Sequence, residues 1–246
     1  MTTRIREPFA PEYAAVAPVR QAGVAAGVGL LLMTALAVFA NFVVLQGVVT
    51  DGDAAATATD IMGSEGMFRL GTVSWLLIAV LDVVVAWALL AVFSPVSRSI
   101  SMLAAWFRLA YAGVLVVAIS QLAGIPRLLG GDEYAAVFTT EQLQAEAMSR
   151  VAAFTDLWSA GLLLFGIHLL IVGYLAYRSG YVPRLLGVLL AVAGLGYAFD
   201  SLAAVVSPDF PIVVSSVTFF GEFCLACWLV FEGLRKPSQS VHGRPR

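Results

Sequence analysis

A few ionisable side chains interrupt long apolar stretches of this sequence, and they are the residues best placed to do chemistry. They are Asp82, Arg108, His168 and Glu222. Ionisable groups are costly in lipid, so those inside apolar helices normally face the bundle interior and find partners there. We therefore treat these four residues as a candidate binding site, an intramembrane charge cluster.

Flanking charges predict that the four side chains share one depth. Asp82 follows Arg69 by thirteen residues, which is about 20 Å of helix. Arg108 follows Arg98 by ten residues, about 15 Å from the opposite side. In a hydrocarbon layer about 30 Å thick, these two depths agree to within about one helical turn. The other two cluster residues stand in the middle part of their own apolar stretches.

Charge is unbalanced within this candidate cluster. Arg108 is its one permanent cation, and a planar guanidinium can bridge two carboxylates, here Asp82 and Glu222. One negative charge remains unless a carboxyl group is protonated or His168 becomes charged. The cluster could therefore hold a proton or a cation, or respond to pH. The alternative is that Asp82 and Arg108 form an ion pair that only fixes helix packing, with His168 a satisfied core residue.

Two further sets of polar residues are weaker candidates. Asp156 and Asp200 are expected near the outer membrane face, on the side away from the termini, where they could form an outer polar layer. Alternatively, Asp156 simply lies at the membrane interface and Asp200 caps the outer end of its span. Cys224 and Cys227 form a C-x-x-C spacing that is typical of redox dithiols. Because this pair stands in a continuous apolar stretch, small-residue packing is the favoured interpretation.

No catalytic or metal-binding motif accompanies these residues. The chain has two histidines, and His242 is in the polar tail, whereas a catalytic zinc site usually needs three protein ligands. The sequence has no P-loop and no nucleophile elbow. We predict no catalytic residue, no metal and no cofactor, so an enzyme is the less favoured interpretation.

The composition predicts that lipid-embedded helices position these residues. Of 246 residues, 60% are hydrophobic and 12% are charged, and the mean hydropathy is +0.91. Soluble domains have about 45–50% apolar and about 25% charged residues. So few charges could not cover a water-soluble protein of this size. Net charge of −2 also argues against a nucleic-acid partner.

Six apolar stretches are each long enough to cross a bilayer as a helix, for which about 20 residues suffice. They are residues 22–49, 70–93, 100–125, 151–177, 185–206 and 212–234. Within lipid, backbone groups must be satisfied inside each segment, which a helix achieves. The predicted fold class is all-α, a six-helix transmembrane bundle over 22–234, with polar terminal segments at 1–21 and 235–246.

The two larger loops are predicted to contain short helices. One helix is expected across Ala54–Ser64. In the other loop, Thr139 and Gln142 have the spacing of a capping box, which predicts a short helix leading into the fourth span.

Basic residues predict the orientation of the bundle. If the N-terminus is cytoplasmic, the cytoplasmic loops and termini hold ten positive residues. The outer loops then hold three: Arg69, Arg127 and Arg150. An excess of Lys and Arg in short loops marks the cytoplasmic side. Both termini are therefore predicted to be cytoplasmic.

Several runs of residues resemble a known family. They are Phe68-Arg69-Leu70-Gly71, Leu81-Asp82-Val83, Ala105-Trp106-Phe107-Arg108-Leu109, the stretch from His168 to Ser201, and Gly221-Glu222. Together these runs resemble a bacterial integral membrane family known as domain of unknown function 4386. The resemblance extends from the first span to the sixth. It implies the membrane architecture and no activity, substrate or cofactor.

These observations leave three classes of function open. The first is a small-molecule, lipid or ion-handling protein, transporter-like, in a bacterial plasma membrane, with the lipid bilayer as its surroundings. The second is a structural or partner-regulating membrane subunit, in which the ion pairs only hold helices together. The third is an intramembrane enzyme. A homo-oligomer is compatible with each.

Overall fold

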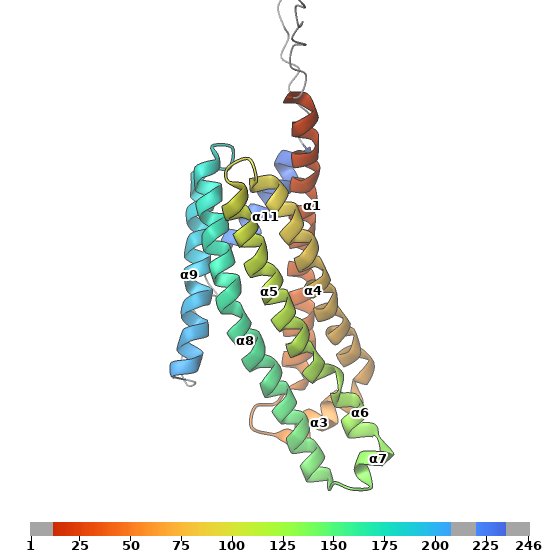
Figure 1. Cartoon of the computed structure of the whole chain (residues 1–246). Helices are drawn as coiled ribbons and strands as arrows, with labels where there is room; N and C mark the ends of the chain where they lie inside the picture. The colour runs from red at the N-terminus through yellow and green to blue at the C-terminus, as the bar shows by residue number, and fades with distance from the viewer. Residues whose placement is uncertain (1–11, 208–219, 235–246) are drawn as a thin grey trace, which may run out of the picture.

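The computed structural model describes residues 12–207 and 220–234, with the side chains of the first helix described from residue 19 onward. Every regular element in these ranges is helical (Figure 1). The elements are α1 (Glu12–Val38), η1 (Phe39–Leu45), α2 (Gln46–Val48), α3 (Ala54–Gly63), α4 (Glu65–Phe93), α5 (Arg98–Ala123), α6 (Ile125–Gly130), α7 (Asp132–Ala135), α8 (Thr140–Ser179), α9 (Arg184–Val206) and α11 (Phe220–Leu234). The all-α prediction is confirmed for these residues.

The long helices form a closed ring. Contacts run from α1 to α4, α5, α8 and α9 in turn, and α11 closes the ring by packing against both α9 and α1. In Figure 1, α11 lies behind α5, and α3, α6 and α7 gather at the lower end. We call this lower end the loop-helix end. The opposite end, with the tight turns at 94–97 and 180–183, is the turn end.

Five helical segments within the described residues are long and apolar enough to cross a membrane. They are Val19–Val48, Glu65–Phe93, Arg98–Gly130, Thr140–Ser179 and Arg184–Val206. The first five predicted spans each fall within or nearly within one of these segments. The sixth, 212–234, lies partly outside the described residues, and its described part, α11, has 15 residues.

The loop-helix end confirms one predicted short helix and corrects the other. Helix α3 occupies Ala54–Gly63, and the side chain of its N-cap residue Asp53 accepts a hydrogen bond from Ala56 N at 2.9 Å. The capping box is also present: Gln142 Oε1 accepts from Thr139 N at 2.9 Å, and Thr139 Oγ1 accepts from Gln142 N at 3.4 Å.

The capping box starts a helix that leads into the fourth span, as predicted, but this helix is neither short nor separate from the span, and the short helix of this loop is α7. The helix begun by the capping box is α8, which continues without a break for 40 residues. No proline interrupts Thr140–Ser179, so nothing in the sequence ends the helix where the apolar stretch begins. At 1.5 Å per residue, α8 is about 60 Å long, and its first half extends well beyond a hydrocarbon layer of about 30 Å.

Glycine pairs bring α8 and α9 into close contact. A Cβ atom at Gly194 would lie 2.5 Å from the carbonyl oxygen of Gly166, and one at Gly173 would lie 2.7 Å from the carbonyl oxygen of Gly187. The two glycines on each helix are seven residues apart, so they share one helical face. Small residues at a helix interface permit this close approach in membrane bundles.

Candidate functional site

Each of the four predicted cluster residues lies on an inward helix face. On α4, Asp82 shares its face with buried Trp75, Ile78 and Val85. On α5, Arg108 follows buried Ala104 and Ala105 by one turn. The small alanines leave space beside α5 for large side chains from neighbouring helices. The spacing of three, four and seven residues is that of a single helical face.

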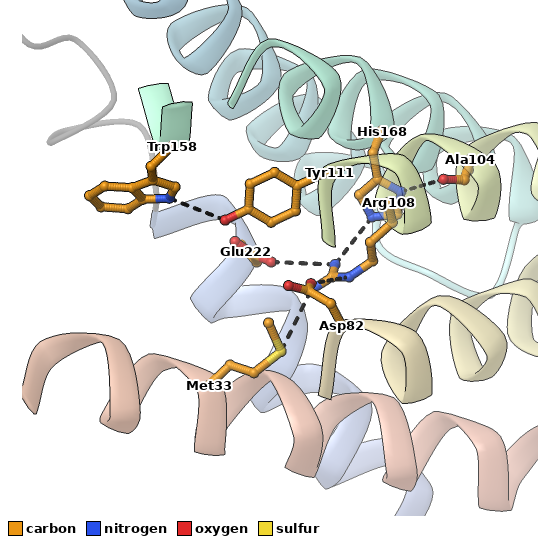
Figure 2. A network of polar contacts seen from close by, with 8 residues as sticks. All are labelled: Met33, Asp82, Ala104, Arg108, Tyr111, Trp158, His168 and Glu222. Atoms are coloured by element: carbon orange, nitrogen blue, oxygen red, sulfur yellow. Dashed lines mark hydrogen bonds and ion pairs between the residues drawn. The ribbon is translucent and has the colours of Figure 1, made fainter. Parts of the chain in front are cut away.

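Arg108 stands at the centre of the cluster and contacts four other helices (Figure 2). Its Nε atom lies 2.8 Å from Asp82 Oδ1, and its Nη1 atom lies 3.7 Å from Glu222 Oε1. Nη1 also lies 3.2 Å from His168 Nε2, and Nη2 lies 3.7 Å from Met33 Sδ. The structure therefore brings all four predicted residues together, from α4, α5, α8 and α11, and adds a methionine from α1.

The hydrogen bonds of His168 define its protonation state. A guanidinium donates hydrogen bonds and cannot accept them, so His168 Nε2 must accept from Arg108. His168 Nδ1, which lies 2.8 Å from the carbonyl oxygen of Ala104, must then carry the proton and donate it. The ring is therefore neutral in this arrangement. His168 does not offset the second carboxylate.

Asp82 is completely buried, yet its carboxylate is poorly satisfied. The Arg108 Nε atom is close enough to Asp82 Oδ1 for an ion pair, but the N–H group is not directed at the oxygen. Among the described residues, neither Oδ1 nor Oδ2 has a hydrogen-bond partner of good geometry. Buried carboxylates normally accept several hydrogen bonds, so this one has capacity for a proton or another donor.

Aromatic side chains cover the cluster toward the loop-helix end. Tyr111 lies one turn beyond Arg108, and its hydroxyl accepts a hydrogen bond from Trp158 Nε1 at 3.2 Å. The Trp158 ring packs edge-on against Trp75, with centroids 4.9 Å apart. On the α8 side, the guanidinium carbon of Arg108 lies 5.3 Å from the ring centroid of Phe165, a cation–π contact. This layer shields the charges from that end of the bundle.

A crevice approaches the cluster from the turn end. It lies between α4, α5 and α8, and Ser101 and His168 contribute its polar groups. It is too narrow at every point to hold a water molecule. The hydroxyl of Ser101 is buried and has no hydrogen-bond partner among the described residues. The crevice therefore carries unused hydrogen-bonding capacity.

The predicted outer polar layer lies apart from the cluster. Asp156 is exposed on α8 and Asp200 is half-buried on α9, and neither is among the partners of Arg108. Nearby, the hydroxyl of Ser201 donates a hydrogen bond to the carbonyl oxygen of Ser159, which links the two helices. Among the described residues, no group of three or more His, Cys, Asp or Glu side chains could hold a metal ion.

The cysteine pair does not share one environment. Both thiols are free, Cys224 being half-buried and Cys227 exposed on α11. The predicted small-residue packing therefore fits Cys224 only in part and does not fit Cys227.

Several residues around the charge cluster were not predicted from the sequence. Met33, Phe165, Tyr111 and Trp158 are ordinary apolar or aromatic residues of a membrane helix. The available signal was spacing: Tyr111 follows Arg108 by three residues, and Phe165 precedes His168 by three, so each shares a face with a cluster residue. No sequence signal indicated that the carbonyl of Ala104 would orient His168.

Comparison with known proteins identifies the family. Residues 25–233 match the family described as Domain of unknown function (DUF4386). The chain belongs to this family. The matched range includes all four cluster residues. The chain is also similar to an uncharacterized protein of Archaeoglobus fulgidus, with 37% identity over 165 residues, covering 67% of this chain and 84% of the relative. No solved structure matches the chain.

Proposed function

We propose that this protein is an ion-handling, transporter-like protein of the cell membrane, and that its charge cluster binds a proton or a small cation. One observation carries the proposal. Arg108, the one buried basic residue in the described ranges, faces two carboxylates, and the histidine beside it is neutral. With both carboxylates ionised, the cluster holds one uncompensated negative charge.

An uncompensated charge in a dry protein interior is unstable, which is why a bound cation or proton is expected. Asp82 and Arg108 are both 0% exposed, so water cannot screen the excess charge. A proton on a carboxyl group, or a small cation beside it, would restore neutrality. Ionisable residues of this kind in membrane helices commonly mark ion and proton pathways.

Access to the cluster is supported on the α11 side. The Glu222 side chain is 21% exposed, whereas those of Asp82 and Arg108 are 0% and 1% exposed. Glu222 is thus the less buried of the two carboxylates, so we assign the exchange of a proton or ion to Glu222 and the lasting partnership with Arg108 to Asp82. A narrow crevice on the turn-end side of the cluster reaches His168, the neighbour of Arg108.

Flux through liposomes tests the proposal. The full-length protein is reconstituted in liposomes that contain a pH-sensitive dye, and a pH gradient is applied with the membrane potential clamped by K⁺ and valinomycin. We expect the internal pH to change faster than in protein-free liposomes. The same assay with a Na⁺ gradient distinguishes proton transfer from cation exchange. Equal rates with and without protein under both gradients would contradict the proposal.

Matched variants assign the flux to the cluster. Glu222→Gln should abolish the flux, and Glu222→Asp, which keeps the charge on a shorter side chain, should retain part of it. Glu232→Gln removes a carboxylate from the same helix, ten residues away, and should leave the flux unchanged. Equal losses in Glu222→Gln and Glu232→Gln, with both proteins folded, would mean that the flux does not pass through the cluster.

A second candidate is a structural or partner-regulating membrane subunit. The observation that favours it is the dryness of the cluster: His168 is 1% exposed, and no water fits in the crevice beside it. In that case the Arg108 contacts serve to hold five helices in register. Under this reading Glu222→Gln changes stability, while liposomes with the wild-type protein show no flux.

The same proposal includes six spans with both termini in the cytoplasm, supported by ten positive residues against three. Labelling with a membrane-impermeant thiol reagent in intact cells tests it, in a background with Cys224→Ala and Cys227→Ala. An introduced Ala55→Cys should react, and Ser238→Cys should react only after the cells are opened. The reverse pattern would place the termini outside.

A further inference from the structure

A wide recess in the described part of the structure lies at the loop-helix end, far from the charge cluster. It has a volume of about 670 Å³ and is bordered by the start of α4, the end of α5, α6 and Met62 of α3. Its charged groups are Glu65, Arg69 and Arg127. Small-molecule sites commonly enclose about 300–1,000 Å³, so this recess has the size of a ligand site.

Three arginines that are far apart in the sequence converge on this recess. Arg69 and Arg127 line it directly. Arg150 reaches it over Gly124, because a Cβ atom at that glycine would lie 2.6 Å from Arg150 Nη1. The Arg150 guanidinium therefore lies beside Gly124, which lines the recess. These are the same three basic residues that the sequence places on the outer side of the membrane.

The arginines are incompletely neutralised. Arg69 pairs with Glu65 at 2.6 Å, and Arg150 pairs with Glu146 at 2.9 Å. Arg127 has no ion pair within the described residues, and its Nη2 atom donates a long hydrogen bond of 3.5 Å to the Tyr134 hydroxyl. Arg69 and Arg150 are thus each paired within their own helices, whereas Arg127 is not. Asp132 and Glu133 of α7 follow the lining residue Gly131, and within the described residues neither forms an ion pair with these arginines.

We propose that this recess binds a phosphate-bearing anion, with Arg127 as its principal contact and Arg69 and Arg150 as supporting cations. Guanidinium groups match the geometry of phosphate oxygens and bind them through paired hydrogen bonds. Arg69 lies thirteen residues, or about 20 Å of helix, from buried Asp82. That distance places the recess at the membrane surface, where a lipid headgroup and a soluble phosphate ester are both within reach.

Binding is measured on the purified full-length protein in a neutral detergent. The ligands are short-chain phosphatidylglycerol, glycerol 1-phosphate, short-chain phosphatidylcholine and glycerol, each titrated while the melting temperature is followed. A saturable rise with phosphatidylglycerol alone identifies an anionic lipid headgroup. A rise with glycerol 1-phosphate as well identifies a site that accepts soluble phosphate esters. No rise with either anion, or an equal rise with phosphatidylcholine, would overturn the proposal.

Changing single charges at the recess should weaken anion binding in one variant and strengthen it in another. Arg127→Gln should weaken binding about tenfold, the scale of one charge-assisted hydrogen bond. Glu65→Gln should strengthen it, because Arg69 loses its competing partner. Arg127 is exposed, so the unliganded melting temperature should change little. Arg98→Gln, an exposed arginine at the turn end, is the matched control and should bind like the wild type. An equal loss in Arg98→Gln and Arg127→Gln would reduce the effect to general charge attraction and contradict a site.

Discussion

The buried ion pair at the centre of the bundle and the exposed ion pairs at the loop-helix end have nearly the same length. Arg108 lies 2.8 Å from Asp82, and the pairs Arg69–Glu65 and Arg150–Glu146 measure 2.6 Å and 2.9 Å. Their surroundings differ. The side chains of the central pair are 1% and 0% exposed, whereas those of Arg69 and Glu65 are 60% and 38% exposed.

The contribution of an ion pair to stability therefore depends on its burial and on which helices it joins, rather than on its length. Each exposed pair joins residues four apart on one helix, so it stabilises a turn that would form anyway. The central pair joins α4 to α5, and through Arg108 it also reaches α1, α8 and α11. Removing one partner leaves a buried charge that water cannot reach.

The largest expected effect comes from Arg108→Leu, which leaves Asp82 buried and unpaired. We expect a loss of about 3–5 kcal/mol in stability. Adding Asp82→Leu should recover part of this loss, because the uncompensated charge is removed with its partner. Melting of both single variants and the double variant in one detergent measures the coupling. Strictly additive losses would mean that the two side chains do not interact.

The two carboxylates of the cluster should differ when each is neutralised. Asp82→Asn deprives Arg108 of its closest partner and should cost about 3 kcal/mol. Glu222→Gln removes the surplus charge from a partly exposed side chain 3.7 Å away, and should cost about 1 kcal/mol or less. Thermal denaturation of the two variants shows which of them loses more stability. A larger loss for Glu222→Gln would reverse the roles that we assign to them.

For the exposed pair, a double-mutant cycle with Glu65→Ala and Arg69→Ala should give a coupling of about 0.3–0.5 kcal/mol. The reason is that both side chains remain largely solvated whether or not they pair. Denaturation in the absence of phosphate keeps the proposed ligand out of the measurement. A coupling as large as that of the central pair would show that exposure is not the controlling variable.

The smallest change is expected from salt. The screening length falls from about 10 Å at 0.1 M to about 3 Å at 1 M salt, and buried pairs are screened much less than exposed ones. The Glu65–Arg69 coupling should therefore fall toward zero in 1 M NaCl, and the Asp82–Arg108 coupling should stay constant. Repeating both cycles at the two salt concentrations measures this. A parallel decline would indicate that water reaches Arg108.

The five candidate spans of the described residues, and the grouping of the four cluster residues, could be predicted from the sequence for one reason. Lipid imposes a uniform requirement on every segment, so an apolar stretch of sufficient length predicts a helix, and a charge within it predicts an inward face. Depth counted from flanking arginines placed Asp82 and Arg108 in one layer, and their side chains do meet. The continuous 40-residue α8 was missed because the end of an apolar stretch does not end a helix; that requires a breaker such as proline.

By itself, the sequence determined the helical class, the approximate span limits and the set of buried charges, because these follow from local composition and helical periodicity. Only the tertiary structure decided how those charges are joined. It fixed the neutral state of His168 through the carbonyl of Ala104, left Asp82 without aligned hydrogen bonds, and exposed Glu222 more than its partners. It also gathered Arg69, Arg127 and Arg150 at one recess, since side-chain contacts between distant segments depend on how the helices pack.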